Sequence, residues 1–339
     1  MKILVLGGTG VISRQIVKQA VEKGYDVTIF NRGSRELPEC AGAQVVLGDR
    51  KAADFADKFA GENYDTVIDM ICFNENDARQ TVEVFGGKAK QIIVTSSIAA
   101  YDRPYHSYPI REETEHLRTD PAFAYGYKKA LLDGYLQSQM HHHPAAITVI
   151  RPSLTFGPGA ANFGMLRQNR NLVRRIKEGK PVVMVGEGVI PRNFTFARDL
   201  AQAFVLACCN ENTYNDVFHV TNSEIVMWED LYRAAGKAVG KEPNMAYISS
   251  HLLREFMPSV CEHLNFEKVH FSVFSTEKFR RAVPEFNPTV GVDEGVKELV
   301  DWWESTDFPY DEERDALEDA VCGAYSKFEQ TLVALTAKQ

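Results

Sequence analysis

The stretch KILVLGGTGVIS, residues 2–13, decides the fold, because it joins a short apolar run to a glycine turn and the turn to a helix. The apolar run 2–6 is typical of a buried strand, and apolar residues then recur at helical spacing from 11 until Gly24. Gly7 and Gly10 let the backbone turn tightly and approach a ligand. A strand that leads through such a turn into a helix predicts a βα unit whose helix N-terminus faces an anion.

Short apolar runs and helical patterns alternate through the first 150 residues. We expect further strands at 26–32, 44–49, 66–73, 91–97 and 147–153, and helices near 52–60, 75–86 and 121–140. Continuous Val, Ile and Leu runs, rather than alternation with polar residues, indicate strands covered on both faces. The sequence therefore predicts an α/β fold with a Rossmann-type, doubly wound parallel sheet and right-handed crossovers.

The regular alternation of short apolar runs with helical patterns ends after about residue 150. A basic helix is expected over 163–179, and a polar helical segment begins at Asp311. We therefore predict three parts: a dinucleotide-binding domain over 1–155, a smaller C-terminal α/β substrate lobe over 156–307 that is partly interleaved with the first, and a C-terminal helical extension over 308–339.

The glycine turn predicts a bound dinucleotide, because the first helical turn offers unpaired N–H groups and a positive dipole end to a pyrophosphate. A tight βα turn without a ligand is the alternative. The residues expected around the pyrophosphate are Gly7, Thr9, Gly10, Val11 and Ile12.

The end of the second strand bears on the choice of cofactor. An Asp there would bond a ribose 2′-hydroxyl and repel a 2′-phosphate, but this chain has Asn31 and Arg32. A guanidinium pairs well with phosphate, so NADP is favoured over NAD. The alternative is that Arg32 is a solvated turn residue, or that it stacks on the adenine with NAD bound. Asp49 ends the third strand, where it is placed to bond the adenine amino group or to serve as an ordinary turn residue.

Tyr125 and Lys129 stand four residues apart in YGYKK (125–129) and so share one helix face. The preceding strand ends in Thr-Ser-Ser at the carboxyl edge of the sheet, where open α/β sheets bind ligands. A tyrosine normally titrates near pKa ~10, and a neighbouring ammonium stabilises its phenolate. The pair therefore indicates an acid/base site; a packed tyrosine beside a surface lysine is the alternative.

These motifs together resemble those of the extended short-chain dehydrogenases/reductases, the group called NAD-dependent epimerases/dehydratases. The likeness is carried by GGTGVIS (7–13), VTSSIAAY (94–101), YGYKK, RPSLTFGPG (151–159) and GEGVIPRNFTFARDLA (186–201), and it covers about residues 1–304. Residues 308–339 have no counterpart that the resemblance supplies.

The resemblance implies specific roles at the expected site. Tyr125 is the acid/base, and Lys129 is its partner and holds the nicotinamide ribose. Ser97 bonds the substrate oxygen, with Ser96 as a near competitor. Hydride then moves between a substrate carbon and the nicotinamide ring.

Two further residues are implied as substrate contacts. Arg192 stands where the family places an arginine on the diphosphate of a nucleotide-sugar, and Asn162 follows the Gly-Pro-Gly segment. The family's 4,6-dehydratases carry an Asp-Glu pair just after the active-site hydroxyl, whereas Ser97 is followed here by Ile98 and Ala99. Dehydration is therefore not expected.

The resemblance thus implies an NAD(P)-dependent oxidoreductase or epimerase acting on a nucleotide-sugar or related carbohydrate. Alternatives are an NADP-dependent reductase of a small carbonyl compound, or a non-catalytic cofactor- or RNA-binding member similar to the chloroplast stem-loop RNA-binding branch. The formal net charge of −8 speaks against nucleic acid as the partner.

The remaining composition narrows the class of protein. Six scattered cysteines without a C-x-x-C pair and no apolar run near ~18 residues favour a cytoplasmic protein without a membrane span. The run His141–His143 ends a helix and is expected to cap it, so no metal site is predicted. The resemblance suggests a homodimer through the helices near 75–86 and 121–140, a point that the sequence leaves open.

Overall fold

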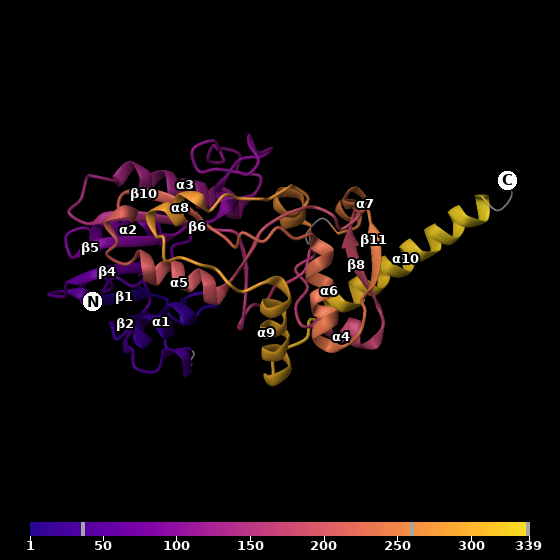
Figure 1. The fold of residues 1–339 in the computed structure, drawn as a ribbon, viewed down its shortest axis with the longest axis horizontal. Coiled ribbons are helices and arrows are strands. Elements are labelled where there is room, and N and C mark those ends of the chain that lie inside the picture. The colour runs from indigo at the N-terminus through magenta and orange to yellow at the C-terminus, as the bar shows by residue number, and fades with distance from the viewer. Residues whose placement is uncertain (35–37, 258–260, 337–339) are drawn as a thin grey trace. The chain divides into compact units, whose positions relative to one another are not determined.

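The computed structural model describes residues 1–34, 38–257 and 261–336, so the last three residues of the expected extension lie outside the described part (Figure 1). The chain divides into two compact units. Unit 1 comprises Met1–Gly157, Asn193–Glu224 and Val273–Val290, and unit 2 comprises Pro158–Arg192, Ile225–Ser272 and Gly291–Gln339. The two units are therefore interleaved along the sequence.

Unit 1 is built on a parallel sheet. Within the described residues the sheet has seven strands in the order β10-β6-β5-β4-β1-β2-β3, and each neighbouring pair is parallel. The strands are β1 (Lys2–Leu6), β2 (Asp26–Asn31), β3 (Gln44–Leu47), β4 (Tyr64–Asp69), β5 (Ala89–Thr95), β6 (Ala146–Pro152) and β10 (Asp216–Val220). The predicted Rossmann-type doubly wound sheet is confirmed, with β1 inside it between β4 and β2.

Both faces of this sheet are buried, which explains the continuous apolar strands. Ile3 and Val5 belong to a core with α1 (Ser13–Glu22), α5 (Ala197–Ala207) and α8 (Glu277–Ala282). Leu4 and Leu6 belong to a second core with α2 (Glu75–Phe85) and α3 (Ala124–Gln139). Since successive residues of a strand point to opposite faces, one run of apolar residues supplies both cores.

The helix expected near 52–60 is wrong, because only a single 3₁₀ turn forms at Asp57–Phe59. Phe55 and Phe59 are buried instead, with their rings 5.2 and 5.5 Å from that of Phe30. Seating both rings in the core fixes the backbone of this segment more strongly than its helical propensity does.

Unit 2 contains a two-stranded parallel sheet of β8 (Pro181–Val185) and β11 (Asn244–Ile248). Its helices are α4 (Asn171–Glu178), α6 (Trp228–Val239), α7 (Ser250–Phe256), α9 (Val292–Ser305) and α10 (Glu312–Thr336), with a π-helical turn at Leu264–Lys268. A short pair, β7 (Leu154–Phe156) and β9 (Phe194–Phe196), belongs to unit 1.

The first half of the helix expected over 163–179 is also wrong, because α4 begins only at Asn171. Arg167 has a left-handed backbone (φ +58°), which interrupts a right-handed helix. The carbonyls of Gly164 and Met165 accept hydrogen bonds from Lys268, which tie this segment to a distant part of unit 2. Tertiary partners thus turn a helical sequence into a loop.

The helix expected from Asp311 begins at Glu312, and its first turns pack on the rest of unit 2. Arg175 of α4 is fully buried and pairs with Asp315 and Asp319 at 3.1 and 2.8 Å. The buried Glu318 accepts a hydrogen bond from the backbone N–H of Val183. The later turns of α10 extend beyond the rest of unit 2 (Figure 1).

Candidate active site

The glycine turn lies between β1 and α1, and β1 is an inner strand of the sheet. Gly7 and Gly8 have φ of +112° and +88°, which side-chain-bearing residues rarely adopt. A Cβ on Gly8 would lie 2.9 Å from Ile29, so the backbone there is packed directly against β2. The sequence prediction named Gly7 and Gly10 but missed Gly8, although the Gly-Gly pair was the available signal.

The N-terminus of α1 faces the turn with bare backbone groups. Gly10 donates its N–H to the hydroxyl of Ser13 at 2.8 Å, and Ile12 supplies no side-chain cap. Among the described residues we find no protein acceptor for the backbone N–H groups of Val11 and Ile12. This cradle of small residues and free donors suits a pyrophosphate, so the residues present fit a dinucleotide cofactor.

The expected adenosine-side residues lie on neighbouring strand ends. Asn31 closes β2, its carbonyl accepts the N–H of Gly48 at 2.9 Å, and Asp49 follows directly. The Asn31 side chain accepts the N–H of Gly33, and Arg32 is exposed. The fold therefore brings Asn31, Arg32 and Asp49 to the same edge.

Lys129 is the most buried of the expected catalytic residues, with 4% of its side chain exposed. Its ammonium donates to the carbonyls of Cys72 and Thr95, each at 2.8 Å, and so joins the segments that follow β4 and end β5. Burial lowers the pKa of Lys129, and Cys72 and Asp69 partly offset that effect. The lysine is thus held at the carboxyl edge of the sheet.

Tyr125 lies in the first turn of the same helix and is 42% exposed. Ser97 is half-buried at the end of β5 and accepts a hydrogen bond from the backbone N–H of Ala99. Ser96 is buried, and its hydroxyl donates to Asp133 at 2.6 Å. Of the two serines, Ser97 is therefore the one that keeps access to solvent.

A buried polar network connects the strand of Ser96 to the helix of Lys129. Asp133, one turn beyond Lys129, binds the guanidinium of Arg151 at 2.7 and 2.6 Å. Arg151 donates in turn to the hydroxyl of Tyr101 at 2.6 Å. Burial would raise the pKa of Asp133, but Arg151 outweighs it and holds that pKa below its usual range. The sequence prediction missed this network.

The expected substrate residues, Asn162 and Arg192, belong to unit 2. Arg192 is 2% exposed, and its guanidinium lies 4.2 Å from the ring centre of Trp228. Asn162 is exposed and lines a hollow of about 590 Å³ together with residues of the segment 308–314.

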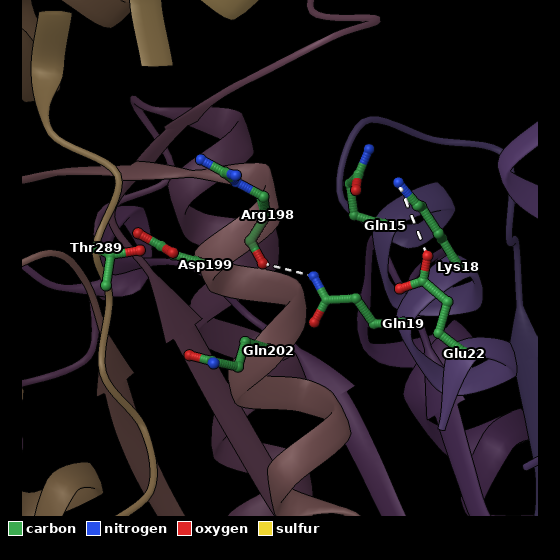
Figure 2. A pocket seen from close by; sticks show the side chains of 8 residues that line it. All are labelled: Gln15, Lys18, Gln19, Glu22, Arg198, Asp199, Gln202 and Thr289. Atoms are coloured by element: carbon green, nitrogen blue, oxygen red, sulfur yellow. Dashed lines mark hydrogen bonds and ion pairs between the residues drawn. The ribbon is translucent and has the colours of Figure 1, made fainter. Parts of the chain in front are cut away.

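A second hollow, of about 310 Å³, lies between α1 and α5 of unit 1 (Figure 2). Its polar groups bond one another: Gln19 donates to the carbonyl of Arg198 at 2.8 Å, and Lys18 pairs with Glu22 at 3.9 Å. The hollow contains none of the expected site residues, and we assign no function to it.

Neither a metal centre nor a membrane span is found in the described part of the chain. Within residues 1–34, 38–257 and 261–336, no three His, Cys, Asp or Glu side chains are grouped to hold an ion. In the same ranges, every helix is too short or too polar to cross a bilayer.

Comparison with curated proteins gives relatives of several activities. A chloroplast stem-loop binding protein of 41 kDa b from Arabidopsis thaliana is 26% identical over 311 residues, which cover 86% of this chain and 77% of the relative. A 2'-dehydrokanamycin reductase from Streptomyces kanamyceticus is 24% identical over 247 residues, covering 72% and 68%. A probable UDP-glucuronate 4-epimerase from Rhizobium meliloti is 22% identical over 340 residues, covering 90% and 97%.

Solved structures agree with the fold. The epimerase Mth375 from Methanothermobacter thermautotrophicus superposes with a TM-score of 0.73 at 16% identity, covering 90% of this chain and 92% of that one. A UDP-glucuronic acid 4-epimerase from Bacillus cereus, solved with NAD, gives a TM-score of 0.68 at 18% identity, covering 90% and 97%. Residues 3–220, more than half of the chain, match the NAD dependent epimerase/dehydratase family. The chain, with its glycine turn after an inner strand of a doubly wound sheet, therefore belongs to the NAD dependent epimerase/dehydratase family.

Proposed function

We propose that this enzyme acts on a nucleotide-sugar or related carbohydrate by hydride transfer, with Tyr125 as the acid/base. The observation that carries the proposal is the placement of Ser97, Tyr125 and Lys129 at the carboxyl edge of the sheet in unit 1. The relatives named as UDP-sugar epimerases support the substrate class.

Each of the three residues has a distinct task. A bound nicotinamide would supply the site that accepts and returns hydride. The Tyr125 phenol exchanges a proton with the substrate hydroxyl, and Ser97 bonds the same oxygen. The buried ammonium of Lys129 favours the phenolate form, since a nearby positive charge lowers a tyrosine's pKa. Its bonds to two carbonyls hold it in place.

The residues after Ser97 favour epimerisation or net redox chemistry over elimination. Loss of water needs a general acid and base beside the reacting carbons. Ile98 and Ala99 follow Ser97 here, and both are buried and apolar. A 4,6-dehydratase reaction is therefore not proposed.

NADP is the cofactor we propose over NAD. Arg32 is exposed just beyond β2, and the strand ends in Asn31 instead of a carboxylate. A guanidinium binds a 2′-phosphate well, whereas a carboxylate would repel it. Mass spectrometry of the copurified cofactor tests this preference: NADP supports it, and NAD alone contradicts it.

Substitution Tyr125→Phe tests the catalytic assignment. Loss of the phenolic proton should lower kcat by roughly 10²–10⁴-fold, the usual contribution of a general acid/base, while cofactor affinity stays within about twofold. Tyr127→Phe, on the same helix but outside the i, i+4 pair, is the matched control. If Tyr125→Phe turns over a responsive nucleotide-sugar within a few-fold of the parent, the assignment is wrong.

Asn162 and Arg192 are the substrate contacts that we propose in unit 2. Because Arg192 is 2% exposed, with its guanidinium over the buried ring of Trp228, contact with a diphosphate requires the residues that cover Arg192 to move. Arg192→Met should then raise KM far more than it lowers kcat. Equal losses in kcat and kcat/KM would count against the assignment.

A second candidate function, RNA binding without catalysis, is favoured by the relative from Arabidopsis thaliana whose name states stem-loop binding. The net charge of −8 argues against it, because non-specific RNA affinity comes mainly from phosphate neutralisation. A salt-dependent gel shift with structured RNA, together with no turnover of any sugar nucleotide, would favour this candidate.

A further inference from the structure

A hollow of about 590 Å³ in unit 2 lies between a loop and the C-terminal extension. It is lined by Ala161, Asn162, Arg167 and Asn169 on one side and by residues 308–314 on the other. Its size lies within the usual range of small-molecule sites. Its second wall is the stretch that the family resemblance leaves without a counterpart.

Arg167 is held rigidly at this hollow. Its φ of +58° is uncommon for a residue with a side chain, and such outliers persist only where surrounding bonds impose them. Its N–H donates to Gly164 at 3.0 Å, and its carbonyl accepts from Arg314 at 3.1 Å. Lys268 fixes the carbonyl of Gly164 from the other side at 2.6 Å.

Arg167 is only half-buried, and among the described residues its guanidinium has no ion-pair or hydrogen-bond partner. Of the three acidic side chains that line the hollow, two already have partners within the protein. Asp311 pairs with the guanidinium of Arg314 at 3.6 Å and accepts its backbone N–H at 3.0 Å, and Glu312 binds Arg174 through both oxygens at 2.7 Å. The hollow therefore keeps one unneutralised arginine, opposed in the described part of the chain by Glu313.

Neutral donors complete the lining. Asn169 uses its side-chain oxygen to accept the N–H of Asn171, which leaves its amide N–H groups available. Asn162 is exposed at the rim. Amide donors beside a guanidinium are suited to oxyanions.

We propose that this hollow binds the phosphate or carboxylate group of a small molecule, with Arg167 as its ion-pairing residue. The guanidinium fork makes paired bonds to two oxygens of such a group. Because the loop is already fixed by Lys268 and Arg314, little order is lost on binding. The anion belongs either to the substrate itself, a case that rests on the proposed function, or to a separate metabolite, a case that does not.

The test is isothermal titration of inorganic pyrophosphate into the full chain loaded with its cofactor. Arg167→Gln should weaken pyrophosphate binding about tenfold or more, as expected for loss of a charge-assisted pair. Glu313→Gln should strengthen it a few-fold, because the opposing charge is removed. Arg254→Gln, which changes an exposed arginine outside the hollow, is the matched control and should leave binding unchanged.

Two outcomes overturn the inference: no pyrophosphate binding to the parent up to about 10 mM, or an Arg167→Gln effect below twofold. If Arg167→Gln does not fold, Glu313→Gln decides alone, and no gain in affinity then contradicts the proposal. Competition by UDP-glucose identifies the substrate as the source of the anion, and simultaneous binding identifies a separate metabolite. Tyr125→Phe should not change pyrophosphate binding, so failure of the proposed catalysis is distinguishable from failure of this site.

Discussion

Among the described residues, Lys129 and Lys268 are lysines that the fold buries and satisfies with backbone carbonyls. Each ammonium joins two neighbouring carbonyls at 3.0 Å or less. Burial disfavours the charged form of both groups, so the energy of these bonds is partly offset by desolvation. At this scale the chain uses lysine to fix loops, in one case from the same helix as the expected catalytic tyrosine.

Lys268 predicts a pH dependence of stability. Burial lowers its pKa to about 7 from 10.5, with Glu267 raising it and Arg192 lowering it further. Between these two pKa values the unfolded chain binds more protons at this site than the folded chain, so the free energy of unfolding should rise as pH rises through that window, by up to about 1.4 kcal/mol per pH unit. Chemical denaturation of the parent and of Lys268→Met at several pH values measures this slope. An unchanged slope in Lys268→Met would show that other groups produce it.

Asp133 predicts a large loss of stability when it is removed. Asp133→Ala leaves Arg151 as a buried charge without its carboxylate, which typically costs about 3–5 kcal/mol. The double variant Asp133→Leu with Arg151→Met should recover much of that loss, since both buried charges are gone. Urea denaturation measures both variants; a single variant within about 1 kcal/mol of the parent contradicts the argument.

At the scale of elements, the β1–α1 turn depends on a glycine at position 8, where there is no room for a Cβ. Gly8→Ala combines a φ of +88° with a contact of 2.9 Å to Ile29, whereas Gly24→Ala places a Cβ at φ +75° in open space. Both variants incur conformational strain, but only Gly8→Ala must also displace β2. We expect Gly8→Ala to lose cofactor affinity more than tenfold while Gly24→Ala changes it less than twofold. Equal cofactor affinities in fluorescence titration would contradict a special role for Gly8.

The elements were predictable where one physical pattern dominated and unpredictable where distant residues intervened. The strands of unit 1 follow from uninterrupted apolar runs, and α2, α6 and α9 follow from apolar residues repeated at helical spacing. The expected helix is absent over 163–170, where Arg167 has a left-handed backbone and where Lys268 and Arg314, more than a hundred residues away, hydrogen-bond to carbonyls of the loop. A short stretch of sequence around 163–170 gives no sign of these distant hydrogen bonds.

At the scale of the whole molecule, we expect a homodimer through α2 and α3. Leu131 on α3 is 39% exposed, and Arg79 of α2 stacks 4.3 Å above the Tyr135 ring, so the two helices present one joint surface. Size-exclusion chromatography with light scattering should give twice the mass of the 38.1 kDa chain. Leu131→Glu should shift that mass to the monomer, because a charge in an apolar contact is costly to bury. A parent chain that elutes as a monomer rejects this prediction.

The sequence by itself determined the α/β class, the glycine turn and the position of Tyr125 and Lys129 on one helix, because each depends on residues close together in the chain. Only the tertiary structure decided that Ser96 is tied to Asp133 while Ser97 keeps access to solvent. It also decided that the guanidinium of Arg167 has no ion-pair or hydrogen-bond partner in the described part of the chain, although its backbone is bonded to Gly164 and Arg314. The physical reason is that burial and charge neutralisation depend on contacts with side chains that are distant in the sequence. The local spacing of residues does not predict those contacts.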